Sequence, residues 1–297
     1  MSAVAVAVAL RCQIGARTIA VVRRRLVRVA GTLDDVLEGR PPQLPRLDGD
    51  GYLLTSVPTL LASGIGGAGL LRVVRQRYVR HHADLSIGYD AWRAGLSGSA
   101  RAALLRKRRK VAARSGGVLD VRGYRTRDGL ATFHPLAVAV SKRTYQARLL
   151  GAGLPDDAGS LAAAADADRV RAWLLFLDDA AIAYLVCTAD GATLRYDHVG
   201  HDPAFADLSP GTVLLHEAMR ALYADRFAWF DFTEGEGQHK RLFATGGTAC
   251  LDLLLLRPTL RNRIAIAAMT GFDAAVALAK RQRHRGVVRA IARRLRR

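Results

Sequence analysis

Hydrophobic and polar positions in the middle of the chain follow a pattern that predicts three consecutive β-strands. The apolar runs RAWLLFLD, AIAYLVCT and TLRYDHVG, within residues 171–200, are separated by Asp179-Ala180 and by the turn residues Ala189-Asp190-Gly191. Short β-type runs joined by turn residues are typical of an antiparallel meander. After them, residues 212–226 carry apolar side chains at helical spacing, namely Leu214, Leu215, Ala218, Met219 and Leu222. We therefore expect a three-stranded meander followed by an amphipathic helix.

The next strand contains a lone carboxylate. Residues 227–232 read FAWFDF, in which Asp231 is the only charged group, and the glycine-spaced loop EGEGQHK follows. A carboxylate buried among aromatic side chains costs several kcal/mol unless it is paired. We therefore expect Asp231 to pair with Lys240 or Arg241 and to order the loop around Gly235. A short helix and the strand TACLDLLLL, which ends at residue 256, complete this region.

Upstream of the meander, the pattern predicts a basic helix. Residues 97–114 can be capped by Ser97 or Ser99 and closed by Gly116. Five of the six residues from Arg106 to Val111 are positively charged, which indicates either a solvated face or a helix that faces an anion. A strand around GVLDVRGY and a helical region at 129–150 should follow.

Two motifs and the order of elements resemble the GNAT acyltransferase superfamily. The narrower likeness is to the acetyltransferase domain of cellulose-biosynthesis-type proteins, which are relatives of the Fem aminoacyltransferases. Those proteins share a helix start "sPG…L" and, some twenty residues later, "D…G…YK". The pattern falls here on Ser209, Pro210, Gly211 and Leu214, and then on Asp231, Gly235 and Lys240, with His239 in place of the tyrosine. The stretch YDAWRAGLSGSARAALLRKRRK resembles a helix of the same group.

The resemblance covers residues 78–256 and implies an α/β fold. It predicts a GNAT-like mixed, mostly antiparallel sheet flanked by helices, with basic helical terminal segments. By this interpretation, residues 1–50 are a basic N-terminal segment and linker, 51–256 are the acyltransferase domain, and 257–297 are a basic helical tail.

The helix start at residues 209–213 is the expected cofactor site. Ser209 can cap the helix, Pro210 suits its first turn, and Gly211 allows close backbone approach. The amides of Gly211, Thr212 and Val213 would then point outward at the positive end of the helix dipole, where a pyrophosphate binds well. These residues alone fit an ordinary capped helix; together with the resemblance they predict an acyl-CoA site.

The resemblance also implies that the bound cofactor lies between two splayed strands, here TLRYDHVG and FAWFDFT. Acid and base groups would then come from the strand ends. We expect Glu234 and His239 to be the groups that take the acceptor's proton, with His198 next and Tyr196 after it.

Other chemistries have less support in the sequence. The cysteines Cys12, Cys187 and Cys250 are odd in number and far apart, no CxxC, GxSxG or HExxH occurs, and no metal site is expected. The glycines at 64, 66 and 69 spell GxGxxG, but Pro58 interrupts the preceding apolar run and no acidic residue follows about twenty positions later. We interpret this stretch as a flexible turn.

The charge balance favours anionic partners. Lys and Arg number 45 against 26 Asp and Glu, a formal net charge of +19. In the tail, Arg281, Arg285, Arg289 and Arg293 recur at helical spacing, so residues 280–297 form either a solvated helix or one that docks on an anionic membrane surface or an acidic partner. We expect a cytoplasmic protein, either free or peripheral at the inner membrane surface.

The sequence as a whole predicts an enzyme that moves an acetyl or other acyl group from acyl-CoA to an amine or hydroxyl acceptor, such as a saccharide or an envelope precursor. Two alternatives stay open. One is a Fem-like transferase that uses aminoacyl-tRNA, for which the +19 charge and the cluster 106–110 would suit RNA phosphates. The other is a non-catalytic GNAT-fold module that binds or scaffolds at a membrane or polysaccharide-synthesis complex.

Overall fold

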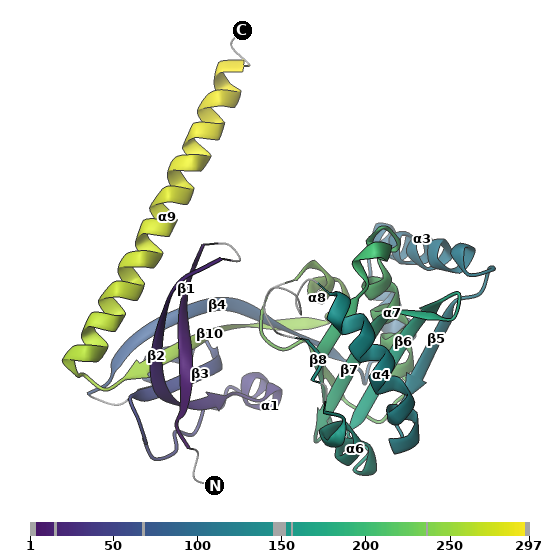
Figure 1. Cartoon of the computed structure of the whole chain (residues 1–297), viewed down its shortest axis with the longest axis horizontal. Coiled ribbons are helices and arrows are strands. Elements are labelled where there is room, and N and C mark those ends of the chain that lie inside the picture. Colours follow the sequence, from purple (N-terminus) through teal and green to yellow (C-terminus); the bar gives the residue numbers. More distant parts are fainter. Residues whose placement is uncertain are drawn as a thin grey trace. The chain divides into compact units, whose positions relative to one another are not determined.

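The computed structural model describes residues 4–14, 17–66, 69–144, 153–155, 157–235 and 237–294 (Figure 1). The chain divides into two compact units. Unit 1 comprises residues 1–78 and 249–297, and unit 2 comprises Val79–Thr248. Strands β4 (Leu71–Asp84) and β10 (Gly246–Leu256) contribute residues to both. These boundaries differ from the expected ones at residues 50 and 256, because both ends of the chain enter unit 1.

Unit 1 is a small sheet with the strand order β1-β2-β3-β10-β4. Strands β1 (Val6–Ile14) and β2 (Arg17–Ala30) form an antiparallel hairpin, and β2 pairs in parallel with β3 (Gly51–Pro58). A short helix, α1 (Leu33–Leu37), and a 3₁₀ turn, η1 (Ala62–Gly64), lie in the connections. The GxGxxG stretch includes residues 67 and 68, which lie outside the described part; the next described element after it is strand β4 and not a helix.

The N-terminal segment is therefore not helical, and that part of the expectation is wrong. Leu10 and Cys12 of β1 and Leu26 of β2 share one hydrophobic cluster, with Arg11 exposed between the first two. Alternation of this kind, with a period of two residues, is the pattern of a strand with one buried face. The alternation was missed in the sequence because many of the exposed positions of this segment are arginines.

The C-terminal helix α9 (Leu260–Arg294) begins against the strands of unit 1. Asn262, Ala265 and Met269 are buried, and Asn262 Oδ1 accepts a hydrogen bond of 2.8 Å from Nε of the buried Arg24. Among the described helices, the segment Leu260–Ala279 is long and apolar enough to cross a membrane by length and composition alone. The expected helical tail is confirmed as far as residue 294, but the side chains of residues 280–297 lie outside the described part.

Unit 2 has the strand order β4-β9-β8-β7-β6-β5. The expected meander is present as β6 (Val170–Leu177), β7 (Ala180–Asp190) and β8 (Thr193–His201), with β5 (Asp120–Tyr124) at the edge. The first turn lies one residue earlier than expected: Asp178 and Asp179 both have positive φ, 47° and 62°, as a tight hairpin turn requires. Strand β9 (Trp229–Asp231) pairs in parallel with β8 and antiparallel with β4.

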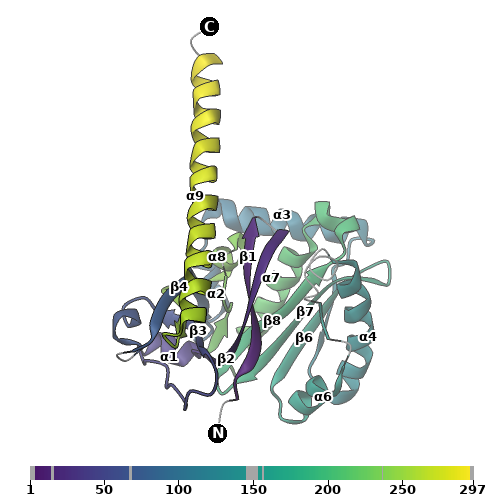
Figure 2. The same ribbon diagram turned by 60° about the vertical axis from the view of Figure 1, so that its left-hand side comes forward.

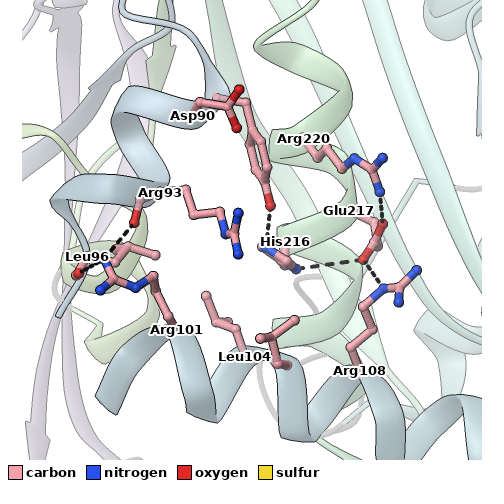
Figure 3. A pocket seen from close by; sticks show the side chains of 11 residues that line it. Asp90, Arg93, Leu96, Arg101, Leu104, Arg108, His216, Glu217 and Arg220 are labelled. Atoms are coloured by element: carbon pink, nitrogen blue, oxygen red, sulfur yellow. Dashed lines mark hydrogen bonds and ion pairs between the residues drawn. The ribbon is translucent and has the colours of Figure 1, made fainter. Parts of the chain in front are cut away.

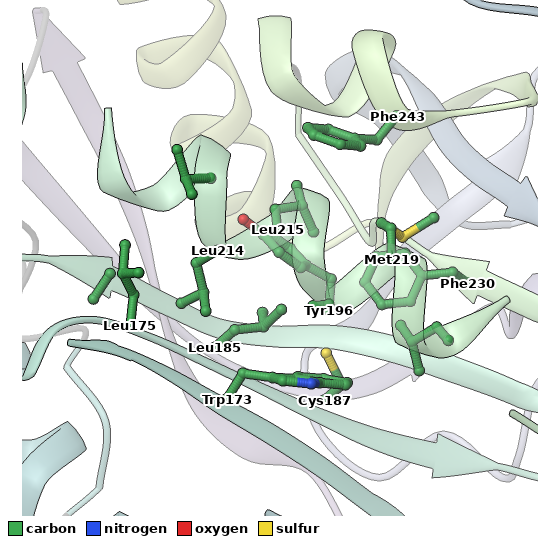
Figure 4. Close-up of a cluster of buried hydrophobic side chains, with 14 of the residues drawn as sticks. Trp173, Leu175, Leu185, Cys187, Tyr196, Leu214, Leu215, Met219, Phe230 and Phe243 are labelled. Atoms are coloured by element: carbon green, nitrogen blue, oxygen red, sulfur yellow. The ribbon is translucent and has the colours of Figure 1, made fainter. Parts of the chain in front are cut away.

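Helices cover both faces of this sheet (Figures 1 and 2). Helices α4 (Arg127–Arg143) and α6 (Gly159–Asp166) pack on the face that carries Ala172, Leu174 and Phe176. Helix α7 (Pro210–Leu222) packs on the opposite face, where Figure 4 shows Trp173, Leu175, Leu185 and Cys187 against Leu214, Leu215 and Met219. Because both faces are covered, the strands are continuous apolar runs and do not alternate.

The remaining helices are α2 (Tyr89–Gly95), α3 (Gly98–Arg114), the 3₁₀ segment η2 (Pro203–Leu208) and α8 (Gln238–Phe243). The expected basic helix is confirmed as α3, where Ser97 Oγ accepts from the Ala100 amide at 3.2 Å. The apolar stripe of α7 is buried as expected. The α/β fold with a mixed, mostly antiparallel sheet flanked by helices is thus confirmed.

Candidate functional site

Strands β8 and β9 separate soon after they meet. They pair in parallel only from Thr193 opposite Trp229 to Arg195 opposite Asp231. Strand β8 continues to His201 along β7, whereas β9 ends at Asp231. The edge of β8 after Arg195 is therefore left without a β9 partner, and a gap opens beside it, as the resemblance implied.

A cavity of about 560 Å³ lies at this gap. Its walls come from β8, from η2, from the start of α7 and from α8. Among the lining residues are Tyr196, Gly200, Ser209, Gly211, Thr212 and His239. The structure thus brings together two parts of the predicted site: the start of α7 and His239, which lies in α8 after the loop that follows β9.

The start of α7 differs in detail from the expected cap. Ser209 adopts a left-handed conformation (φ 53°, ψ 48°) and its side chain caps nothing. Its carbonyl accepts from the amides of Thr212 at 3.0 Å and Val213 at 3.2 Å. These two amides are therefore not available for a ligand, contrary to the expectation. Pro210 has no N–H, so Gly211 is left, and its amide has no acceptor within the described part of the chain.

Gly211 also leaves its surroundings open. A Cβ atom built on Gly211 would meet only His201 Nδ1, at 3.7 Å, which is an ordinary contact. One free amide at the positive end of a 13-residue helix, with space in front of it, can hold a negatively charged group.

The partner of the buried carboxylate was predicted wrongly. Asp231 is fully buried and forms a bidentate pair with Arg80 of β4: Arg80 Nε donates to Oδ1 at 3.1 Å and Nη2 donates to Oδ2 at 2.5 Å. The Thr233 amide adds a third bond to Oδ1 at 2.8 Å. Lys240 instead donates to the carbonyl of Glu234 at 2.6 Å, and Arg241 is exposed. The loop is thus held by Lys240 through the backbone, and the strand end by Arg80.

His239 and Tyr196 face each other across part of the cavity, with ring centroids 5.9 Å apart. Burial, and to a lesser degree the charge of Lys240, lowers the pKa of His239. Its Nε2 is buried and has no hydrogen-bond partner among the described residues. Burial raises the pKa of Tyr196. At neutral pH the cavity therefore contains a neutral imidazole and a protonated phenol, a proton acceptor beside a proton donor.

Two other predicted residues are placed elsewhere. Glu234 is exposed, and Gly235 next to it has a positive φ of 87° that suits glycine. His198 is half-buried opposite Val186 on β7. Neither Glu234 nor His198 is among the described residues that line the cavity.

Cys187 is a core residue and not a nucleophile. It is fully buried, and burial raises the pKa of its thiol, so the reactive thiolate is disfavoured. Among the described residues, no group of three or more His, Cys, Asp and Glu side chains could hold a metal ion.

Comparison with known proteins agrees with this geometry. Residues 98–241 match the family model described as an acetyltransferase (GNAT) domain. Among solved structures, the C-terminal domain of a protein described as a putative lysylphosphatidylglycerol synthetase from Agrobacterium fabrum is 14% identical, with 76% of this chain and 72% of that chain covered and a TM-score of 0.51. FemX is 10% identical, with 89% and 90% covered and a TM-score of 0.50. No curated protein matches the chain.

Over residues 98–241 the chain matches a GNAT-type acetyltransferase domain, and the GNAT fold resemblance stated from the motifs is confirmed. At identities of 10–14% the two solved structures support a shared fold and not a shared substrate.

Proposed function

We propose that unit 2 transfers an acyl group from acyl-CoA to an amine or hydroxyl acceptor, with acyl-CoA bound in the cavity beside β8. The observation that carries the proposal is the convergence on one cavity of the free Gly211 amide, the start of α7 and the His239 imidazole. A volume of about 560 Å³ falls in the usual range of small-molecule sites.

In this proposal each residue has one task. The Gly211 amide and the helix dipole of α7 hold the pyrophosphate of the cofactor. His239 Nε2 takes a proton from the acceptor as its nitrogen or oxygen forms a bond to the acyl carbon. The bond between carbon and sulfur then breaks, and the Tyr196 hydroxyl gives its proton to the leaving thiolate. The base is thus His239, and Glu234 contributes only its carbonyl to the contact with Lys240.

Binding of the cofactor can be tested at Gly211. Gly211→Ala should fold, because the added methyl meets nothing closer than 3.7 Å. That methyl would take up space beside the amide on the cavity wall, so acetyl-CoA affinity measured by calorimetry should fall at least about tenfold. Gly98→Ala is a matched control, since Gly98 also lies in the first turn of a helix and its Cβ would meet nothing within 4 Å. Equal affinities for the two variants would place the pyrophosphate away from α7.

The base can be tested by comparing His239→Gln with Glu234→Gln. Loss of a positioned general base should lower kcat by roughly 10²–10⁴-fold with little change in CoA affinity. We expect this for His239→Gln, and near-parent turnover for Glu234→Gln. Slow hydrolysis of acetyl-CoA, or transfer to a panel of amines and saccharides, reports turnover without knowledge of the acceptor. The reverse ranking would return the role to Glu234. No turnover by the parent would favour the non-catalytic alternative.

Aminoacyl-tRNA is the second candidate donor, in line with the fold similarity to FemX. Two residues of the basic cluster on α3 are engaged within the protein, since Arg108 pairs with Glu217 and Lys110 with Asp207. Arg106 and Arg109 are exposed and available to phosphates. Tight tRNA binding that weakens steeply with salt, in a protein that binds no acyl-CoA, would favour this donor.

The basic C-terminal segment also supports a proposal about where in the cell the protein acts. We propose a cytoplasmic protein that associates peripherally with an anionic membrane through residues 280–297, where arginines follow the apolar segment of α9. The parent should float with vesicles containing anionic lipid and stay behind with neutral ones. Replacing Arg285, Arg289 and Arg293 together by Gln should abolish flotation; flotation that survives would move the contact elsewhere.

A further inference from the structure

A second cavity in unit 2, separate from the proposed acyl-CoA site, collects arginine side chains. It has a volume of about 370 Å³ and lies between α2, α3 and α7 (Figure 3). None of its described lining residues also lines the cavity beside β8. It contains Arg93 from α2, Arg101 and Arg108 from α3, and Arg220 from α7.

The charges in this cavity do not balance. Four arginines face two carboxylates, Asp90 and Glu217, which leaves a net charge of +2 at neutral pH. Glu217 is shared: Arg108 Nε donates to it at 2.9 Å, and Arg220 Nη1 lies 4.0 Å away. One carboxylate thus serves two guanidinium groups.

The other two arginines of the cavity, Arg101 and Arg93, differ in their contacts. Nη1 of Arg101 donates to the carbonyls of Arg93, Ala94 and Leu96, which fixes its guanidinium at the end of α2. The Arg93 guanidinium has no hydrogen-bond or ion-pair partner among the described residues, and Figure 3 shows it directed into the space between the helices. Its charge is available to a ligand.

The wall of the cavity also presents a buried donor. His216 is only 8% exposed, and its Nε2 lies 3.0 Å from the hydroxyl of Tyr89. Its Nδ1 has no hydrogen-bond partner among the described residues, and Glu217 Oε1 is 3.6 Å away. With a carboxylate so near, the favoured neutral tautomer has the proton on Nδ1 and the lone pair on Nε2, which accepts from Tyr89.

We propose that this cavity binds the phosphate group of a small phosphate monoester. A phosphate monoester carries about −1.5 to −2 charge at pH 7 and has three acceptor oxygens. That charge matches the +2 excess of the cavity, and the donors around it, Arg93, Arg220 and His216 Nδ1, match the oxygens. Guanidinium groups are the side chains best suited to phosphate, because they donate in a planar fork. The proposal does not depend on the reaction at the other cavity.

Calorimetry with inorganic phosphate and with glycerol 1-phosphate, at constant ionic strength in chloride, tests this site. The parent should bind both, and still bind both when acetyl-CoA is saturating. Arg93→Gln and Arg220→Gln remove charge-assisted contacts and should each weaken binding about tenfold or more. Both side chains are exposed, so the variants should fold. Arg114→Gln is the matched control and should bind like the parent, because Arg114 is an exposed arginine at the end of α3 that does not line the cavity.

His216 provides a second test, which distinguishes a specific phosphate site from nonspecific attraction of anions to a positively charged surface. His216→Asn keeps a donor near the position of Nδ1, whereas His216→Gln keeps the contact to Tyr89 and loses that donor. Phosphate should bind more tightly to the Asn variant than to the Gln variant at equal melting temperatures. Three results would overturn the proposal: no phosphate binding by the parent, an equal loss in Arg114→Gln, or displacement of phosphate by acetyl-CoA, which would place the anion in the other cavity.

Discussion

Replacing Asp231 by Asn should destabilise unit 2 far more than the loss of a surface ion pair does. Asp231 is fully buried and Arg80 is 4% exposed, and three hydrogen bonds converge on the carboxylate. Asn has almost the same shape. Its oxygen can still accept from Arg80 or from the Thr233 amide, but its NH₂ group would face the second Arg80 N–H, donor against donor.

The expected magnitude follows from the burial of two cations. Removing one partner of a buried ion pair costs about 3–5 kcal/mol, because the remaining charge loses its counter-charge in a poorly solvated site. Lys240, which is 8% exposed and whose pKa is lowered by burial and partly restored by Asp231, loses a favourable neighbour as well. With about 2–4 °C per kcal/mol for a domain of this size, the melting temperature should fall by about 6–20 °C.

Differential scanning calorimetry suits the measurement, because a chain with two compact units need not unfold in one step. Asp166→Asn is the control: Asp166 pairs with Arg127 on the surface, where solvent screens the pair, and its loss should change little. A melting temperature of Asp231→Asn no lower than that of the control would show that the carboxylate is hydrated in solution and would refute the reasoning.

Three further changes test the helices and the histidines. Ser97→Ala removes the N-cap of α3 and should lower the free energy of unfolding, measured with denaturant, by about 1 kcal/mol. Ser97→Asp, which can also cap the helix, should retain the stability of the parent. Met219→Ala empties a fully buried position under α7 and should cost about 2–5 kcal/mol, whereas Met219→Leu should cost less than about 1.5. Burial lowers the pKa of His82, His216 and His239 below 6.5, so near that pH the unfolded chain binds protons that the folded chain does not. The free energy of unfolding, measured by urea titration, should therefore decrease as pH falls below about 6.5. A flat profile from pH 7 to 5 would contradict these shifts.

The elements that the sequence predicted well are those whose signal is local. Helix α3 follows from a serine cap and a glycine after its end, and α7 from five apolar residues at helical spacing. The meander follows from apolar runs broken by turn residues. Each signal lies within about fifteen residues, where backbone preference and burial act on the same segment. The hairpin of β1 and β2 was missed because its exposed face is rich in arginine, which is also typical of a solvated segment.

The pairing of Asp231 could not be predicted in this way. A desolvated carboxylate requires a cation, and that requirement alone correctly indicated burial and pairing. Its partner, however, is 151 residues away, and only the alignment of β4 with β9, which puts His82 opposite Asp231, brings Arg80 within reach. Lys240 and Arg241 were chosen because they follow Asp231 closely along the chain, and sequence distance is a poor guide once strands pair.

In the candidate site, too, features with a local sequence signal could be predicted, whereas features that depend on the folded backbone could not. Gly211 and His239 come from the stretch that carries the two motifs, and Tyr196 comes from the preceding strand β8; the structure places all three on one cavity. Which amides of α7 remain free depends on the left-handed turn at Ser209, because that turn directs its carbonyl toward Thr212 and Val213. No residue type indicates such a turn when the position is serine and not glycine.

The turn at Ser209 can also be tested for a change on binding. If it relaxed, Thr212 would regain a free amide, and an anion would gain a second donor beside Gly211. Ser209→Gly would tolerate the left-handed conformation without strain and so stabilise the turn. Hydrogen exchange at the Thr212 amide, measured with and without acetyl-CoA, reports which state the ligand selects. Protection by the ligand that is weaker in Ser209→Gly than in the parent would mean that the turn opens, and equal protection would mean that Gly211 acts alone.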